Sequence, residues 1–182
     1  MENLPNRKQN RLDKFDYASP GTYFVTICAN ERQNVFWKND FLSIFMQQGL
    51  ANEIDYFVDS VGATIGRPQG IRLSTLGQMV EETICNISAK YSGVFVDYFV
   101  VMPDHIHLLL RTGVDKHGRP MVAPTLSTII RQFKGYVTKR AGKPVWQKLF
   151  FDHVVRNEQD YIEHIKYILE NPTRWRNKQN VL

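Results

Sequence analysis

Apolar residues recur along the chain with two periods, which predict four strands and three helices. Strands are expected where β-branched and aromatic residues cluster, at Tyr23–Ala29, Val94–Met102, His105–Arg111 and Val145–Arg156. Helices are expected where apolar residues recur every three or four positions, from Ser74 to Ala89, from Thr125 or Ser127 to Arg140, and from Asn157 to Asn171. This order predicts an α+β fold, a ferredoxin-like β-α-β-β-α-β sandwich with an antiparallel sheet, followed by an added C-terminal helix.

The chain has 182 residues, which is about the size of one domain. Residues 1–20 are interpreted as an N-terminal arm, 21–176 as a single domain and 177–182 as a basic tail. Within the domain, residues 40–72 are interpreted as an insertion, with helix-like stretches before a loop that contains glycine and proline.

Positive charge is concentrated in the last third of the chain. The whole sequence carries a net charge of +5, and residues 125–182 contain 11 Lys and Arg against 5 Asp and Glu. Such an imbalance favours a polyanionic partner, although a solvated basic surface would have the same composition. Hydrophobic residues make up 43% of the sequence and charged residues 23%, which excludes a disordered chain.

Cysteine content and the polar N-terminus indicate the compartment. Cys28 and Cys85 are too few for a disulfide framework and too far apart for a CxxC metal motif. No apolar run approaches the roughly 18 residues of a membrane span. We therefore expect a soluble cytoplasmic protein with no membrane partner.

The motif Pro-Asp-His-Ile-His at residues 103–107 is the clearest candidate for chemistry. Side chains at positions i and i+2 of a strand share a face, so His105 and His107 are predicted to point the same way. Two neighbouring imidazoles can bind Mn²⁺ or Zn²⁺, whereas Mg²⁺ prefers oxygen ligands. The alternative is a strand edge with two partly exposed histidines.

The last helix is predicted to have one apolar and one polar side. The apolar side consists of Tyr161, Ile162, Ile165, Ile168 and Leu169, and the polar side of Asp160, Glu163, His164, Tyr167 and Asn171. Tyr167 is thus an aromatic residue on the polar side, where it is either functional or a surface tyrosine. Asn171 follows one turn later, and Pro172 is expected to end the helix.

Three segments together resemble the REP-associated tyrosine transposases, a group of single-tyrosine HUH transposases in which U is a hydrophobic residue. These are YFVVMPDHIHLLL, the FKGY segment at Phe133–Tyr136, and VWQKLFFDHVVRNEQDYIEHIKYILENPTRW with its Tyr-x-x-x-Asn-Pro spacing. The resemblance extends from Pro20 to Trp175 and marks residues 21–176 as an HUH-type catalytic domain.

In that family two histidines and a polar residue four positions after the tyrosine bind a divalent metal. The resemblance therefore implies that His105, His107 and Asn171 bind Mg²⁺ or Mn²⁺ and that Tyr167 is the nucleophile. Related insertion-sequence enzymes usually have Gln at the last position; Asn is shorter but has the same carbonyl acceptor.

The family relationship implies a metal-dependent, single-stranded DNA endonuclease and strand transferase. It would act on hairpin or palindromic repeat DNA through a 5′-phosphotyrosine intermediate, as a monomer or a homodimer. The alternative is a non-cleaving hairpin-binding module derived from the same family. A third interpretation, a hydrolase that activates water, predicts no covalent protein–DNA adduct.

Further residues are candidates for supporting roles. Candidate DNA contacts are Arg131, Lys134, Lys139, Arg140, Trp146 and Arg174. Each basic residue has the alternative of a solvated helix face, and at least one of the three tryptophans is expected in the core. His153 and His164 are candidates for a layer around the metal ligands, and His164 also for a proton relay.

Overall fold

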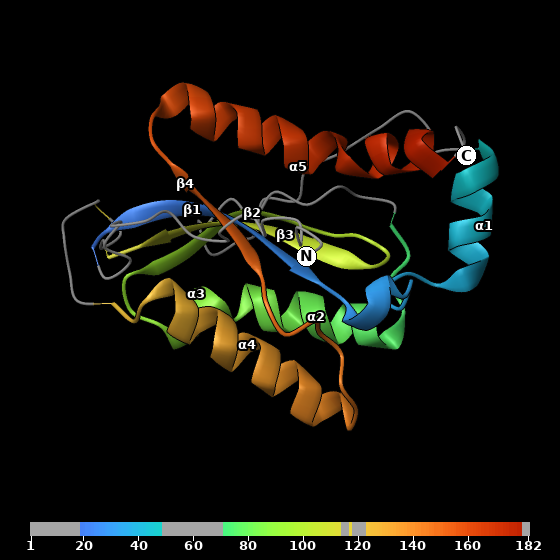
Figure 1. Ribbon diagram of the computed structural model, residues 1–182, viewed down its shortest axis with the longest axis horizontal. Coiled ribbons are helices and arrows are strands. Elements are labelled where there is room, and N and C mark those ends of the chain that lie inside the picture. Colours follow the sequence, from blue (N-terminus) through green and yellow to red (C-terminus); the bar gives the residue numbers. More distant parts are fainter. Residues whose placement is uncertain (1–18, 49–70, 114–116, 118–122, 180–182) are drawn as a thin grey trace, which may run out of the picture.

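The computed structural model describes residues 19–48, 71–113, 117 and 123–179, in which four strands form one sheet. These are β1 (Gly21–Cys28), β2 (Val94–Val101), β3 (His105–Thr112) and β4 (Phe151–Val155). The strand order is β2-β3-β1-β4, and every neighbouring pair is antiparallel (Figure 1). The predicted α+β, ferredoxin-like arrangement is confirmed.

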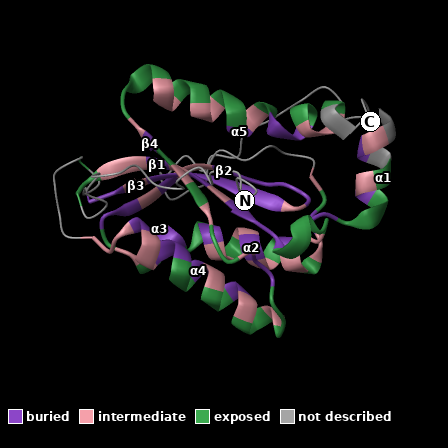
Figure 2. Ribbon diagram, viewed as in Figure 1, coloured by how far each residue is buried: buried purple, intermediate pink, exposed green. Residues whose placement is uncertain are grey.

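Helices cover both faces of the sheet. Figure 1 shows α2 (Thr75–Cys85), α3 (Ile87–Lys90) and α4 (Leu126–Ala141) on one face, and α5 (Glu158–Gln179) on the other. The short helix α1 (Asn39–Gln48) lies beside the C-terminal end of α5. Buried side chains follow the strands and the sheet-facing sides of α2 and α4 (Figure 2), because burial of apolar surface drives this packing.

The helices begin at the residues that the sequence predicts. The side chain of Ser74 accepts a hydrogen bond from the Gly77 amide at 3.0 Å, and that of Thr125 accepts one from the Thr128 amide at 3.3 Å. Asn157 accepts one from the Asp160 amide at 2.9 Å. Each side chain satisfies a backbone donor that has no partner within the first turn of a helix.

Two predicted boundaries are wrong. Helix α5 continues through Pro172 to Gln179, because Pro172 is buried and Trp175 packs 5.9 Å from the Trp37 ring, which compensates for the missing backbone donor. The strand expected at Val145–Arg156 is limited to β4. Before it, the carbonyl groups of residues 147–149 accept hydrogen bonds from the Lys134 ammonium group.

The predicted apolar side of the last helix is also partly wrong. Ile162 is exposed, whereas Asn171 is buried and His164 is half-buried. The helix is therefore rotated relative to the prediction, so that part of its polar side faces the sheet. This rotation brings the candidate residues of α5 toward β1 and β3.

Other predictions lie outside the described residues. These are most of the N-terminal arm, residues 49–70 of the insertion, and the last three residues of the basic tail. Among the helices that the structure describes, none has a stretch sufficiently long and apolar to span a membrane.

Candidate functional site

The two histidines of β3 face α5, as the alternation of strand side chains predicts. Their Nε2 atoms lie 3.1 Å apart, and both side chains are buried. Ile106 and Leu108, which alternate with them, are buried on the opposite face of the sheet. The alternative of two partly exposed histidines at a strand edge does not fit this burial.

Each histidine is held through its Nδ1 atom. His105 Nδ1 lies 2.6 Å from a carboxylate oxygen of Asp104, and His107 Nδ1 lies 2.8 Å from the hydroxyl of Thr26. Thr26 is the partner of His107 in the β1–β3 register. Because both Nδ1 atoms form hydrogen bonds to neighbouring side chains, the Nε2 atoms are the ring nitrogens available to bind a metal ion.

The protonation of this pair suits metal binding. Burial lowers the pKa of His107 well below its ordinary value, and the positive charges of His105, Arg32 and His164 lower it further. Burial raises the pKa of Asp104, but the hydrogen bonds and positive charges of His105 and Arg32 together outweigh this effect, so the net pKa is lowered. An ionised Asp104 requires His105 Nδ1 to donate, and in the neutral form of His105 this leaves a lone pair on the Nε2 atom.

The donor set therefore fits a divalent cation. Without one, the Nε2 atoms can approach to 3.1 Å only if one of them carries a proton. With one, both lone pairs can point at the ion while His107 Nδ1 donates to Thr26. The Thr26 hydroxyl can donate or accept, so it accommodates both tautomers of His107.

Tyr167 lies directly beside the histidine pair. Its ring meets the ring of His107 edge-on, with centroids 5.2 Å apart, and its side chain is 36% exposed. The Arg174 guanidinium group lies 5.8 Å from the centre of the Tyr167 ring. The structure thus brings together an accessible phenol, two imidazoles and a cation.

Asn171 is buried on α5, one turn beyond Tyr167. Among the described residues, the buried polar side chains are His105, His107, Thr112 and Asn171, so three of these four are the predicted metal ligands. Within the described part of the chain, no hydrogen bond joins the Asn171 amide to either histidine. Its role as a ligand stays a prediction.

His153, Asp160 and His164 form a second polar cluster, whose potential ligand atoms lie within 4.8 Å of one another. Asp160 accepts hydrogen bonds from His153 at 2.9 Å and from the Arg156 amide at 3.0 Å, and lies 3.1 Å from His164 Nδ1. These contacts connect β4 to the first turn of α5. The ring of Phe24 contacts the rings of both His164 and His107, which places His164 around the candidate site rather than in it.

Arg32 was not found by sequence reasoning. It lies in a 3-10 turn in which both Glu31 and Arg32 have positive φ angles, 52° and 54°. Such backbone strain in residues other than glycine often occurs at functional sites. The Arg32 guanidinium group lies 3.4 Å from Asp104, so it adds a cation next to the carboxylate that orients His105. No sequence signal predicts a positive φ at these residues.

The candidate DNA contacts differ in their surroundings. Arg131, Lys139 and Arg140 are exposed on α4, on the face of the sheet away from Tyr167, and Arg174 is exposed on α5 (Figure 1). Lys134 donates to three backbone carbonyls, the nearest at 2.6 Å, which favours a structural role.

The predicted stacking of Trp146 on DNA bases is not supported, because its ring is buried between Phe36 and Phe133. Trp37 is also buried, and Trp175 is partly buried against the core, which confirms that at least one tryptophan is a core residue.

No family model matches the chain. An uncharacterised Haemophilus influenzae protein is 28% identical over 97% of this chain and 93% of its own length. The REP-associated tyrosine transposase of Escherichia coli K12 is 33% identical over 56% of this chain and 58% of its own length. A putative REP-associated tyrosine transposase of H. influenzae is 29% identical, and the match covers 41% of this chain and 47% of that relative.

One solved structure supports the fold. A REP-associated tyrosine transposase bound to a REP hairpin superposes with a TM-score of 0.55 and 22% identity, over 90% of this chain and 73% of the other. The sequence matches to named relatives and the shared fold agree with the resemblance carried by the His-Ile-His and Tyr-x-x-x-Asn-Pro motifs. The chain is thus similar in sequence to REP-associated tyrosine transposases over about half of its length, and it shares its fold with one of them.

Proposed function

We propose that this protein is a metal-dependent endonuclease and strand transferase for single-stranded hairpin DNA. The observation that carries the proposal is the contact between Tyr167 and His107, with ring centroids 5.2 Å apart. An accessible phenol beside two converging imidazole nitrogens is the arrangement needed to present a nucleophile and a cation to the same phosphate.

In this proposal His105, His107 and Asn171 hold Mg²⁺ or Mn²⁺, which would supply Lewis-acid polarisation of the scissile phosphate. Side chains of the protein perform the other parts of the reaction. Arg32 provides positive charge near the histidine pair, and Arg174 provides it near the Tyr167 ring. These charges stabilise the negative charge that the non-bridging oxygens of the phosphate gain in the transition state.

Tyr167 acts as the nucleophile. Its oxygen loses a proton to solvent and forms a bond to phosphorus, the P–O3′ bond breaks, and the leaving 3′ oxygen takes up a proton. The product is a 5′-phosphotyrosine and a free 3′-OH. Attack by a 3′-OH in the reverse direction rejoins the strand and releases Tyr167, with no need for ATP because the phosphodiester energy is retained.

The test uses single-stranded hairpins labelled at either end, incubated with the protein and Mn²⁺ or Mg²⁺. We expect the wild type to shift the 3′-labelled DNA into a covalent adduct on a denaturing gel and to release the 5′-labelled fragment. Tyr167→Phe should form no adduct yet keep its hairpin affinity. Tyr136→Phe, which removes the hydroxyl of an exposed tyrosine on α4, should behave as the wild type.

Each other result identifies a different function. Adduct formation by Tyr167→Phe would assign the nucleophile to another residue. Cleavage without an adduct would indicate a hydrolase. Hairpin binding with neither cleavage nor adduct would indicate the non-cleaving binding module, and cleavage that survives a chelator would exclude the metal.

A further inference from the structure

The second polar cluster, made of His153, Asp160 and His164, takes no part in the proposed reaction. It connects two elements, because His153 lies on β4 and the other two residues lie in the first two turns of α5. Each residue offers one potential ligand atom, and the three atoms lie within 4.8 Å of one another. Two imidazoles and one carboxylate are a ligand set that proteins use to bind Zn²⁺.

The three donor atoms have nearly the spacing of metal ligands. The Asp160 carboxylate lies 2.9 Å from His153 Nε2 and 3.1 Å from His164 Nδ1. Neighbouring ligand atoms of a tetrahedral Zn²⁺ ion, each about 2.0–2.2 Å from the metal, are about 3.3 Å apart. The two imidazole rings stack nearly parallel, with an angle of 23° between them. An ion can therefore enter with small movements of these side chains and replace the protons that the imidazoles share with the carboxylate.

The ionisable groups of the cluster suit a metal. Burial raises the pKa of Asp160, but hydrogen bonds from His153 and the Arg156 amide and the positive charges of the two histidines outweigh this effect, so the net pKa is lowered. His164 Nδ1 donates to the backbone carbonyl of Asp160 at 2.8 Å. That carbonyl is also the regular helical acceptor for the His164 amide, so it keeps a donor when Nδ1 binds a metal instead.

The cluster is held by the fold and is open to solvent. His153 is the partner of Phe24 in the β1–β4 register, and Asp160 accepts a hydrogen bond from the Arg156 amide at 3.0 Å. The side chain of His153 is 48% exposed, whereas those of Asp160 and His164 are each 19% exposed. An ion can thus reach the cluster from solvent and keep water at its remaining positions.

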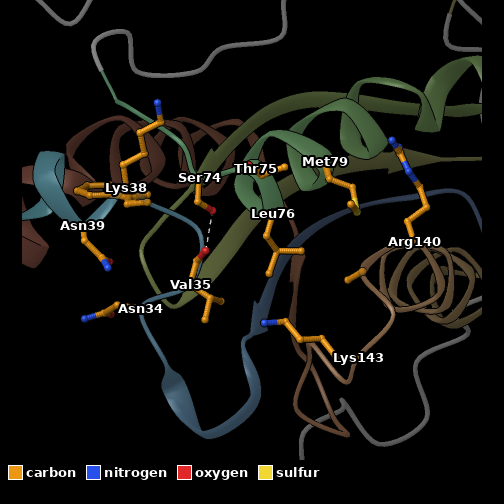
Figure 3. Close-up of a pocket in the computed structure, with 12 residues that line it drawn as sticks. Asn34, Val35, Lys38, Asn39, Ser74, Thr75, Leu76, Met79, Arg140 and Lys143 are labelled. Carbon is orange, nitrogen blue, oxygen red and sulfur yellow. Dashed lines mark hydrogen bonds between the residues drawn. The ribbon is translucent and has the colours of Figure 1, made fainter.

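The cluster is separate from the histidine pair of β3. The ring of Phe24 contacts the ring of His164 with centroids 4.5 Å apart and that of His107 with centroids 5.1 Å apart, so an aromatic side chain connects the two groups of imidazoles. A cavity of about 560 Å³ on the helical layer has no His, Cys, Asp or Glu in its lining (Figure 3), so it offers none of these ligands.

We propose that His153, Asp160 and His164 form a further metal site, which binds Zn²⁺ and joins β4 to the start of α5. Imidazole nitrogens suit Zn²⁺, whereas Mg²⁺ prefers a shell of oxygen ligands. The ion fixes the first turns of the helix that also carries Tyr167. The inference does not depend on the proposed function, because it concerns ion binding and stability rather than cleavage.

The test measures Zn²⁺ binding without the histidine pair of β3. The parent protein is the His105→Gln/His107→Gln double variant, which is titrated with Zn²⁺ by calorimetry and unfolded by heat with and without Zn²⁺. In this background His153→Gln removes one ligand of the cluster, and its fold should persist because His153 is half exposed. His117→Gln, in an exposed turn, is the matched control.

We expect the parent and His117→Gln to bind one Zn²⁺ ion per chain with equal affinity. His153→Gln should bind Zn²⁺ at least about tenfold more weakly, since loss of a direct ligand costs no less than loss of a residue that supports a ligand. Zn²⁺ should raise the unfolding temperature of the parent through linkage and that of His153→Gln much less. Asp160→Asn should give the same two results.

Two results would overturn the inference. No Zn²⁺ binding by the folded parent would leave the cluster as a set of hydrogen bonds and ion pairs. Equal affinity in His153→Gln and His117→Gln would show that any bound ion lies elsewhere on the protein. If the parent does not fold, bound zinc is counted in the otherwise wild-type chain. One fewer ion in His153→Gln than in the wild type then supports the site, and equal numbers overturn it.

Discussion

The phenolic hydroxyl of Tyr161 donates a hydrogen bond to a carboxylate oxygen of Asp97 on β2, at 2.9 Å. Asp97 also receives two hydrogen bonds from Arg111, at 2.6 Å and 2.8 Å. Burial and the negative charge of Asp97 both raise the pKa of Tyr161. Tyr161 is thus held in its neutral form, whereas Tyr167, six residues later on the same helix, is accessible beside His107.

This difference predicts opposite effects of two tyrosine substitutions. Tyr161→Phe should lower the free energy of unfolding by about 1 kcal/mol, because one hydrogen bond to a partly buried carboxylate is lost. It should leave adduct formation unchanged. Tyr167→Phe should have the reverse pattern, with stability unchanged and adduct formation lost. Urea unfolding and the adduct gel measure the two properties, and loss of adduct in Tyr161→Phe would mean that Tyr161 takes part in the reaction.

Asp104 is predicted to control metal affinity through His105. Asp104→Asn keeps the size of the side chain but removes the charge that makes His105 Nδ1 the donor at 2.6 Å. Loss of such a supporting hydrogen bond typically weakens metal affinity 10–100-fold, so we expect a decrease of about that size in Mn²⁺ titrations. Asp40→Asn, at an exposed position of α1, is the control and should bind Mn²⁺ as the wild type does. His105→Ala should lose metal binding and cleavage together while it keeps most of its DNA affinity.

Much of the fold could be predicted because its signals are local. Alternation placed His105 and His107 on one face of β3, and the capping side chains of Ser74, Thr125 and Asn157 marked three helix starts. These signals depend on neighbouring residues alone, so they are present in the sequence. The order of strands and helices then restricted the topology to the ferredoxin-like arrangement.

The rest depends on contacts between distant parts of the chain. The hydrogen bond between Thr26 and His107 joins residues 81 positions apart and exists only because β1 and β3 pair in one register. The burial of Asn171 depends on the rotation of α5 and on its continuation past Pro172, which local propensity opposes. Packing of Trp175 near Trp37 offsets that propensity, and helix periodicity carries no information about it.

Lys134 is predicted to stabilise the fold rather than to bind DNA. Its ammonium group donates to the carbonyls of Gln147, Lys148 and Leu149, at 2.6, 3.0 and 3.5 Å. Lys134→Met keeps the aliphatic stem but leaves these carbonyls without their charged donor, so we expect a loss of about 1–3 kcal/mol in urea unfolding. Lys139→Met, on the exposed side of α4, should change stability by less than about 0.5 kcal/mol.

The same two variants distinguish a structural role from a DNA contact. If Lys134 only supports the fold, the salt dependence of hairpin binding by Lys134→Met should match that of the wild type at a temperature where both are folded. A smaller salt slope in Lys134→Met together with normal stability would reassign this residue to the DNA interface.

His107 is predicted to make the stability of the metal-free protein depend on pH. Its pKa in the folded state is well below its ordinary value of 6.5. Between these two pKa values the unfolded chain takes up a proton that the folded chain does not. Acid therefore favours unfolding, and the contribution of His107 decreases as the pH falls below about 6.5. The slope from this one group cannot exceed about 1.4 kcal/mol per pH unit.

The substitution His107→Gln removes the titrating group, and an amide can still form a hydrogen bond with Thr26. We expect this variant to have a flatter profile of unfolding free energy between pH 6.5 and pH 5, measured by urea unfolding with a chelator present. His117→Gln, in an exposed turn, is the control and should keep the wild-type slope. Saturating Mn²⁺ should stabilise the wild type through linkage and give His107→Gln much less stabilisation. A His107→Gln profile as steep as that of the wild type would show that His107 is not the buried neutral imidazole that the contacts around it require.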